Sequence, residues 1–144
     1  MVVVDVANVM GARADGWWRD RAGAALRLCR EVAALARRGY DSDDGDGHEG
    51  GGRVSAGEWV LVLEGKARAA AREFDGGDGH GDAAPVVRVL SAPGSGDDAI
   101  VGVVEEAVAR DETCLVVTAD RELRQRCEEL GASVTGPGWL LRML

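Results

Sequence analysis

The sequence predicts an α/β protein, a three-layer α/β/α sandwich around a mainly parallel sheet of four or five strands. Short apolar runs alternate with longer segments whose apolar residues recur at helical spacing, in the order βαβαβαβαβα. The predicted strands are apolar along most of their length, which is typical of a sheet that helices cover on both faces. A single domain is expected for all of residues 1–144, because a chain of this length can build a real core.

The first elements are a strand and a long helix. In the opening segment, MVVVDVANVM, three valines precede Asp5, which suits a buried strand that ends at a carboxylate. Residues 11–18 have the composition of a loop, and Asp15 is the expected N-cap of a helix from about Trp17 to Arg38. Gly39 is suited to end that helix.

Two acidic, Gly-rich inserts interrupt the alternation, at about residues 41–56 and 75–84. Residues 41–52 and 73–82 together contain nine acidic residues and neither lysine nor arginine. Without those nine acids the formal net charge changes from −8 to about +1. We expect both inserts to be flexible loops, with His48 and His80 as surface residues. The overall acidity therefore does not exclude a polyanionic substrate.

The second half of the chain continues the alternation. Strands are expected at 58–63, 86–90, 113–118 and 132–135. Helices are expected at 66–74, from Ser95 to about Arg110, at 121–130, and after Pro137.

Acidic residues follow the first four predicted strands. They are Asp5, Glu64, the pair Asp97 and Asp98, and Asp120 with Glu122. Because parallel strands joined by right-handed crossovers end at one edge of the sheet, these carboxylates should converge there. Asp98 and Asp120 would individually suit a helix N-cap equally well, whereas Asp5, Glu64 and the Asp97-Asp98 pair together are harder to explain in that way. Together they predict a site for Mg²⁺ or Mn²⁺, in which Asn8 and Thr118 would orient a ligand or its water.

Composition restricts the class of protein further. The hydrophobic fraction of 46% argues against general disorder. No apolar run approaches the roughly 20 residues of a membrane span, and the first is too short for a signal peptide. Cys29, Cys114 and Cys127 are odd in number and indicate reduced thiols. We therefore expect a soluble, cytoplasmic protein without membrane association.

Three motifs together resemble the NYN branch of the PIN-like ribonucleases. They are Asp5-Val-Ala-Asn8-Val9, Gly94-Ser-Gly-Asp97-Asp98-Ala-Ile100 and Val117-Thr118-Ala-Asp120-Arg-Glu122-Leu123. The segment from Asp15 to Arg21 also resembles small bacterial NYN proteins, and the likeness covers the chain apart from the two inserts. The resemblance implies a PIN-like fold and a ribonuclease that depends on Mg²⁺ or Mn²⁺.

The resemblance also implies roles for the acids. Asp5 matches the first-strand metal ligand, Asp98 best matches the central acid, with Asp97 beside it, and Asp120 matches the late acid. Asp5, Asp98 and Asp120 would be catalytic, and all four would bind metal. Glu122 stands where the family often has Asp, so that it is a supporting candidate only.

Other supporting and substrate-facing residues are chosen by their position. Glu64 corresponds to no firm family position and is held as a supporting acid. Four cations flank the predicted edge and would contact RNA phosphates: Arg13, Arg19, Arg21 and Arg121. Trp17 and Trp18 are able to stack on bases, although the favoured interpretation is that at least one of them packs on the core.

Several alternatives stay open. A catalytically weak NYN module would bind RNA or a protein partner without cleaving it. Another Mg²⁺-dependent phosphohydrolase would usually carry Asp-x-Asp after its first strand, where this chain has Ala7 at the third position. A nucleotide-binding module would need a phosphate loop that the sequence lacks. The sequence also leaves open whether the protein is a homodimer.

Overall fold

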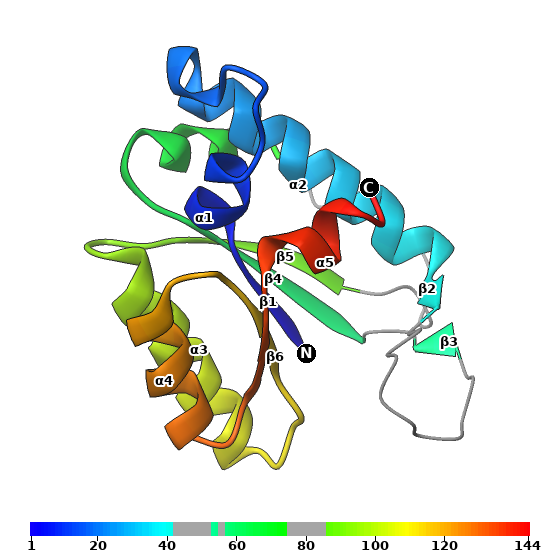
Figure 1. Ribbon diagram of the computed structural model, residues 1–144, viewed down its shortest axis with the longest axis vertical. Helices are drawn as coiled ribbons and strands as arrows, with labels where there is room; N and C mark the ends of the chain where they lie inside the picture. The colour runs from blue at the N-terminus through cyan, green and yellow to red at the C-terminus, as the bar shows by residue number, and fades with distance from the viewer. Residues whose placement is uncertain (42–52, 55–56, 75–85) are drawn as a thin grey trace.

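The computed structural model describes residues 1–41, 53–54, 57–74 and 86–144. Most of the two acidic inserts, including His48 and His80, therefore lies outside the described residues, and the expectations for them are untested. The described part forms a three-layer α/β/α sandwich, as predicted (Figure 1).

The five strands of the sheet are all parallel, in the order β5-β4-β1-β6-β7. They are β1 (Val2–Asp5), β4 (Glu58–Leu63), β5 (Val86–Ser91), β6 (Leu115–Val117) and β7 (Ser133–Thr135). The central strand is β1, in which Val3 pairs with Val60 of β4 and with Val116 of β6. The chain builds outward from β1 through β4 to β5 and then returns to β6 on the other side. This reversal makes the end of β1 the switch point of the sheet, the usual place for a ligand in such folds.

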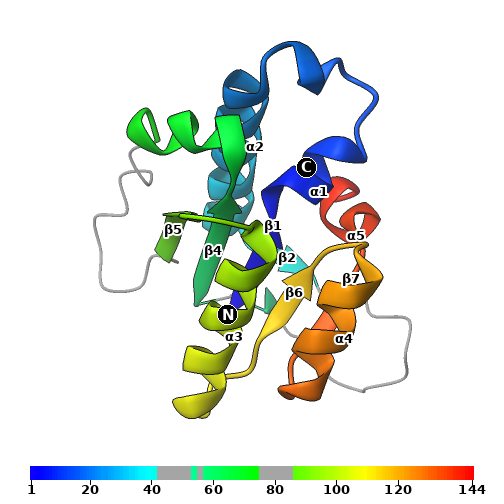
Figure 2. The ribbon, with the colours of Figure 1, turned by 90° about the vertical axis from the view of Figure 1, so that its left-hand side faces the viewer.

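Helices cover both faces of the sheet (Figures 1 and 2). One face carries α1 (Val6–Gly11), α2 (Arg21–Arg38), the 3₁₀ helix η2 (Gly65–Arg72) and α5 (Pro137–Leu141). The other face carries α3 (Gly96–Ala109) and α4 (Arg121–Glu129). Successive residues of β1 serve the two halves of the core, since Val2 and Val4 face α2 while Val3 faces α3. This double burial explains the unbroken run of valines.

The beginning of α2 differs from the prediction. A short helix, α1, starts directly after β1, and a 3₁₀ turn, η1 (Trp17–Arg19), precedes α2. The N-cap is Asp20, which accepts a hydrogen bond of 2.9 Å from the Gly23 amide, so the prediction of Asp15 as the cap was wrong. Asp15 instead forms an ion pair of 3.5 Å with Arg27 on the next turn of α2. Either aspartate is chemically able to cap a helix, and the packing of Trp17 on the core selects the later one.

Two further elements differ in kind. The helix predicted at 66–74 is the 3₁₀ helix η2, in which Ala67 and Ala70 are buried at a spacing of three residues. A minimal antiparallel hairpin, β2 (Tyr40–Asp41) with β3 (Arg53–Val54), brackets the first insert, where only a loop was expected.

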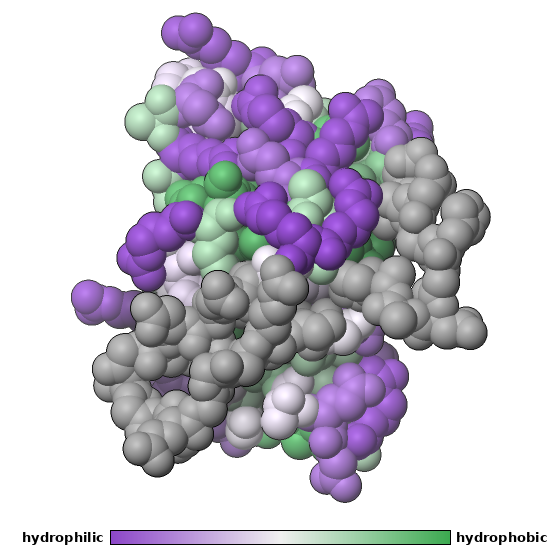
Figure 3. Space-filling view, turned by 90° about the vertical axis from the view of Figure 1, so that its right-hand side faces the viewer, coloured by the Kyte–Doolittle hydropathy of each residue, from purple (hydrophilic) through white to green (hydrophobic). Residues whose placement is uncertain are grey.

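The surface of the described part is largely polar. Its exposed large hydrophobic side chains are Trp18 and Val108. Figure 3 shows one face on which hydrophilic side chains gather over the upper half. The three cysteines are buried and unpaired, as expected. Within the described ranges no helix is both long and apolar enough to cross a bilayer.

Candidate active site

The site begins with Asp5, the last residue of the central strand. Its side chain is buried, with only 8% of the residue exposed. The carboxylate accepts a hydrogen bond of 3.3 Å from the Asn8 amide at Oδ1 and one of 3.0 Å from the Thr118 hydroxyl at Oδ2. Both oxygens are thereby fixed in direction, so that Asp5 is held as a rigid group at the switch point.

Thr118 and Asn8 tie the end of β1 to the segment after β6. The buried Thr118 hydroxyl donates to Asp5 and accepts a hydrogen bond of 3.2 Å from the Asp120 amide. The Asn8 side chain accepts one of 2.9 Å from the Ala119 amide through Oδ1. In the structure the Thr118 hydroxyl therefore joins Asp5 to the backbone of Asp120, and the Asn8 side chain holds the backbone of the residue before Asp120. The predicted action of both side chains on a ligand or its water stays a prediction.

Glu64 and Asp97 bring two more carboxylates to the same edge. Glu64 directly follows β4 and accepts a hydrogen bond of 2.6 Å from the Gly96 amide through Oε2, which anchors the start of α3. A Cβ atom on Gly96 would lie 2.8 Å from that oxygen, so that glycine is what permits this close approach. Asp97 is the next residue of α3 and is half-buried.

Burial and crowding change the protonation of Asp5. Its pKa is raised from 3.8 to about 6, chiefly by burial and to a smaller extent by the nearby charges of Asp97 and Glu64, against the opposing effect of its two hydrogen bonds. A buried carboxylate with two negative neighbours is therefore partly protonated near neutral pH.

Asp97 lies at the centre of the same field. Burial raises its pKa, and the charges of Asp120, Glu64 and Glu122 raise it as well. The nearby Arg126 opposes them. Acids from the ends of β1, β4 and β6 and from the first turn of α3 are thus close enough to influence one another, as the convergence argument predicted.

Asp98 is directed elsewhere. Its side chain is 76% exposed and forms an ion pair of 3.1 Å with Arg126 of α4. Asp97, by contrast, lies three and seven residues before Ile100 and Val104, which are fully buried on the inner face of α3. The geometry therefore favours Asp97 as the central acid, although the resemblance pointed to Asp98. The helical spacing to these apolar residues is the sequence signal that separates the two.

Asp120 and Glu122 occupy the first turn of α4. Asp120 is the N-cap and accepts a hydrogen bond of 3.0 Å from the Leu123 amide at Oδ1. The capping role and a place in the acidic cluster are both compatible with its position. Glu122 is exposed and acts on the cluster through its charge on Asp97.

The four predicted substrate-binding arginines lie in environments that differ from one another. Arg13 is engaged by Glu31 at 2.6 Å, and Arg121 is exposed at the start of α4. The Arg19 guanidinium lies 5.9 Å from the ring centre of Trp18, and that of Arg21 lies 5.5 Å from the ring centre of Trp17.

Arg21 and Trp17 reach the acidic edge. They line a pocket of about 300 Å³ together with Met10 and Glu64. Trp17 packs partly against the core, as one of the two tryptophans was expected to do, whereas Trp18 is 57% exposed.

The donor chemistry of this edge is suited to a hard divalent cation, because the converging ligands are carboxylates whose mutual repulsion a cation would relieve. Within the described residues, however, no three Asp, Glu, His or Cys side chains are already spaced to hold an ion. Asp5, Glu64 and Asp120 are each held by a hydrogen bond, whereas no hydrogen bond to another described residue holds the Asp97 carboxylate.

The fold is shared with Rae1 (YacP) from Bacillus subtilis, whose W164L mutant aligns with a TM-score of 0.61. The alignment covers 98% of this chain and 72% of that one, at 15% sequence identity. No family model and no curated protein matches the sequence. The likeness establishes the fold over nearly the whole chain and leaves the activity to be argued from the site.

Proposed function

We propose that the protein is a ribonuclease of the NYN type, acting in the cytoplasm with Mg²⁺ or Mn²⁺ at the end of β1. The observation that carries the proposal is Asp5, a buried carboxylate whose pKa is raised to about 6 beside two further acids. Burying and crowding carboxylates costs stability, and such perturbed groups cluster at functional sites. The motifs that resemble NYN proteins support RNA as the substrate.

The residues of the site divide into ligands and positioning groups. Asp5, Asp97 and Asp120 would hold the cation, which would supply an activated water and stabilise the charge that develops on the phosphate. Thr118 holds Asp5 in direction through its hydroxyl. Glu64 anchors α3, and with it Asp97, to the sheet edge through the Gly96 amide.

Arg21 and Trp17 would serve the substrate beside these acids. The guanidinium is able to pair with a phosphate, and the ring is able to stack on a base. Their shared pocket includes Glu64, so a nucleotide bound there would lie next to the proposed ligands.

Cleavage assays on single-stranded and structured RNA test the proposal. We expect cleavage with Mn²⁺ or Mg²⁺, its loss in EDTA, and its loss in Asp5→Asn and Asp120→Asn. The matched control is Asp111→Asn, because Asp111 is an exposed acid at the far end of α3 whose φ of 58° asparagine also tolerates. Cleavage that survives in both site variants would overturn the assignment.

A second candidate is an RNA-binding module that does not cleave. It is favoured by the spacing of the acids, since the described residues contain no ready group of three ligands for an ion. Binding of RNA that stays intact with either cation would select this candidate.

A further inference from the structure

A cationic groove runs along η2, the green coil that follows β4 and lies above β5 in Figure 2. Its volume is about 590 Å³, and its charged lining residues are Lys66, Arg68 and Arg72. Among the described residues that line this groove none is acidic, and Ser91 at the end of β5 contributes to its wall. The three cations have no acidic partner among the described residues, which leaves their charge uncompensated within that part of the chain.

The 3₁₀ geometry of η2 aligns two of these cations. With three residues per turn, Lys66 and Arg72 lie two turns apart in an ideal helix and share an exposed row with Ala69, about 120° around the axis from the buried Ala67 and Ala70. At about 2 Å of rise per residue they are separated by roughly 12 Å along the axis. Such a spacing allows them to contact different phosphates of one strand.

Arg68 has a structural part in the groove. Its Nε donates a hydrogen bond of 3.1 Å to the Gly65 carbonyl, and its Nη1 donates one of 3.4 Å to the Ala92 carbonyl. It thereby ties η2 to the segment after β5. Lys66 and Arg72 are the cations whose removal leaves this connection intact.

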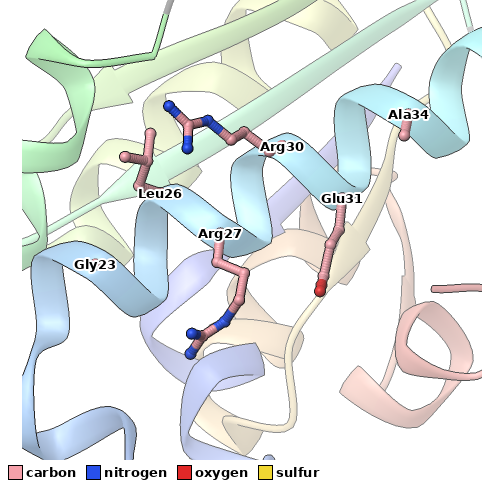
Figure 4. Close-up of a pocket in the computed structure, with 6 residues that line it drawn as sticks. All are labelled: Gly23, Leu26, Arg27, Arg30, Glu31 and Ala34. Atoms are coloured by element: carbon pink, nitrogen blue, oxygen red, sulfur yellow. The ribbon is translucent and has the colours of Figure 1, made fainter.

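A second basic hollow, of about 450 Å³ on α2, is a poorer candidate (Figure 4). Arg27 and Arg30 point to opposite sides of the helix there, and Glu31 contributes a negative charge. Arg27 is paired with Asp15, so part of the positive charge is already neutralised by the protein. The groove along η2 offers a polyanion more uncompensated charge.

The groove leads to the acidic edge. Gly65 lines both the groove and the pocket that contains Trp17, Arg21 and Glu64. It follows Glu64 directly and has a φ of 57°, so the chain turns from the site into η2 at this residue. A strand lying along the groove would therefore arrive beside the proposed ligands.

We propose that this groove binds the phosphates of single-stranded RNA and guides the strand to the acids at the end of β1. The inference rests on the proposed function, whose substrate it specifies. A single strand is preferred to a duplex because the pocket next to Gly65 is able to take an unpaired base beside Trp17, whereas a duplex keeps its bases stacked inside.

Binding is tested separately from cleavage, by fluorescence anisotropy of a labelled short single-stranded RNA in EDTA. The variant Lys66→Ala/Arg72→Ala is compared with Arg37→Ala/Arg110→Ala, which removes the same charge from the C-terminal ends of α2 and α3. Two lost phosphate contacts should reduce the slope of log K against log salt by about 1.4 and weaken binding about 25-fold at about 0.1 M salt. The control should change affinity by less than about 2-fold.

The outcomes separate this inference from the proposed function. Equal affinities and salt slopes for the two double variants, with cleavage by the wild type intact, would overturn the groove and leave the nuclease. Groove-dependent binding without cleavage in Mn²⁺ or Mg²⁺ would support the groove and overturn the nuclease. A duplex of the same sequence that binds as tightly as the single strand would refute the preference for an unpaired strand.

Discussion

Replacing Asp5 with asparagine should stabilise the fold at neutral pH while it abolishes the proposed cleavage. The aspartate is ionised at that pH only against the cost of burial and of the neighbouring charges of Asp97 and Glu64. Asparagine has nearly the same shape and carries no charge. Its carbonyl is able to accept from the Asn8 amide, and its NH₂ group is able to donate to the Thr118 hydroxyl oxygen.

The shift in pKa sets the upper limit of this gain. The pKa of Asp5 rises from 3.8 to about 6, or about two units, and each unit corresponds to about 1.4 kcal/mol. Since the folded-state pKa lies above the unfolded one, the contribution of Asp5 to stability is most favourable below about pH 4 and is lost as pH rises through about 6. Asp5→Asn should therefore be more stable by up to about 3 kcal/mol at about pH 8, with little gain at about pH 4.

Urea unfolding followed by circular dichroism measures this difference at the two pH values. Asp111→Asn serves again as the control and should leave the free energy of unfolding unchanged at both. An Asp5→Asn protein no more stable than the wild type at about pH 8 would refute the reasoning. So would a gain of equal size at both pH values, because it would not come from ionisation.

Three further predictions concern the same edge. Asp97→Asn should reduce kcat/KM for cleavage by about 100-fold or more, whereas Asp98→Asn should leave kcat/KM within about threefold of the wild type. The reverse order of effects would restore Asp98 as the central acid. Thr118→Val removes a hydrogen bond that lowers the pKa of Asp5, so the acidic limb of the pH profile of kcat/KM should move to higher pH. An unchanged acidic limb would show that Thr118 does not influence the ionisation of Asp5. Mn²⁺ at about 100 times its Kd should raise the free energy of unfolding of the wild type by about 2.7 kcal/mol and that of Asp5→Asn by much less. An equal increase in the two proteins would exclude Asp5 as a ligand of the cation.

The arrangement of the sheet could be predicted because the apolar sequences of the strands indicate burial on both faces. Val2, Val3 and Val4 are apolar at every position, and only a central strand with helices on both sides buries all three. From that placement and the rule that parallel strands end together, the placing of Asp5, Glu64 and Asp120 at one edge of the sheet followed. The choice between two nearby residues that are both able to cap a helix was harder to predict. Asp15 and Asp20 are equivalent as caps, and the tertiary contacts of Trp17 decided between them.

The choice between Asp97 and Asp98 shows where a motif is less informative than periodicity. The motif places two aspartates in the first turn of α3, and consecutive residues of a helix point about 100° apart. Only one of them is able to share the inner face with Ile100 and Val104. That residue is Asp97, and its neighbour turns toward Arg126 instead. The apolar residues further along the helix therefore specify the acid that the motif leaves ambiguous.

The kind of helix in η2 decides which cations would face RNA in the proposed groove, and composition could not reveal it. Alanine has the highest α-helix propensity, so the alanines at 67 and 69–71 favoured an α-helix. In an α-helix, six residues make one and two-thirds turns, which would turn Lys66 and Arg72 away from each other. Residues 65–72 instead form a 3₁₀ helix, whose Ala67 and Ala70 pack against the core, and six residues then complete two turns. The sequence-based prediction chose arginines near the acids in the chain, whereas the two cations that η2 aligns, Lys66 and Arg72, have no acidic partner within the described part of the chain.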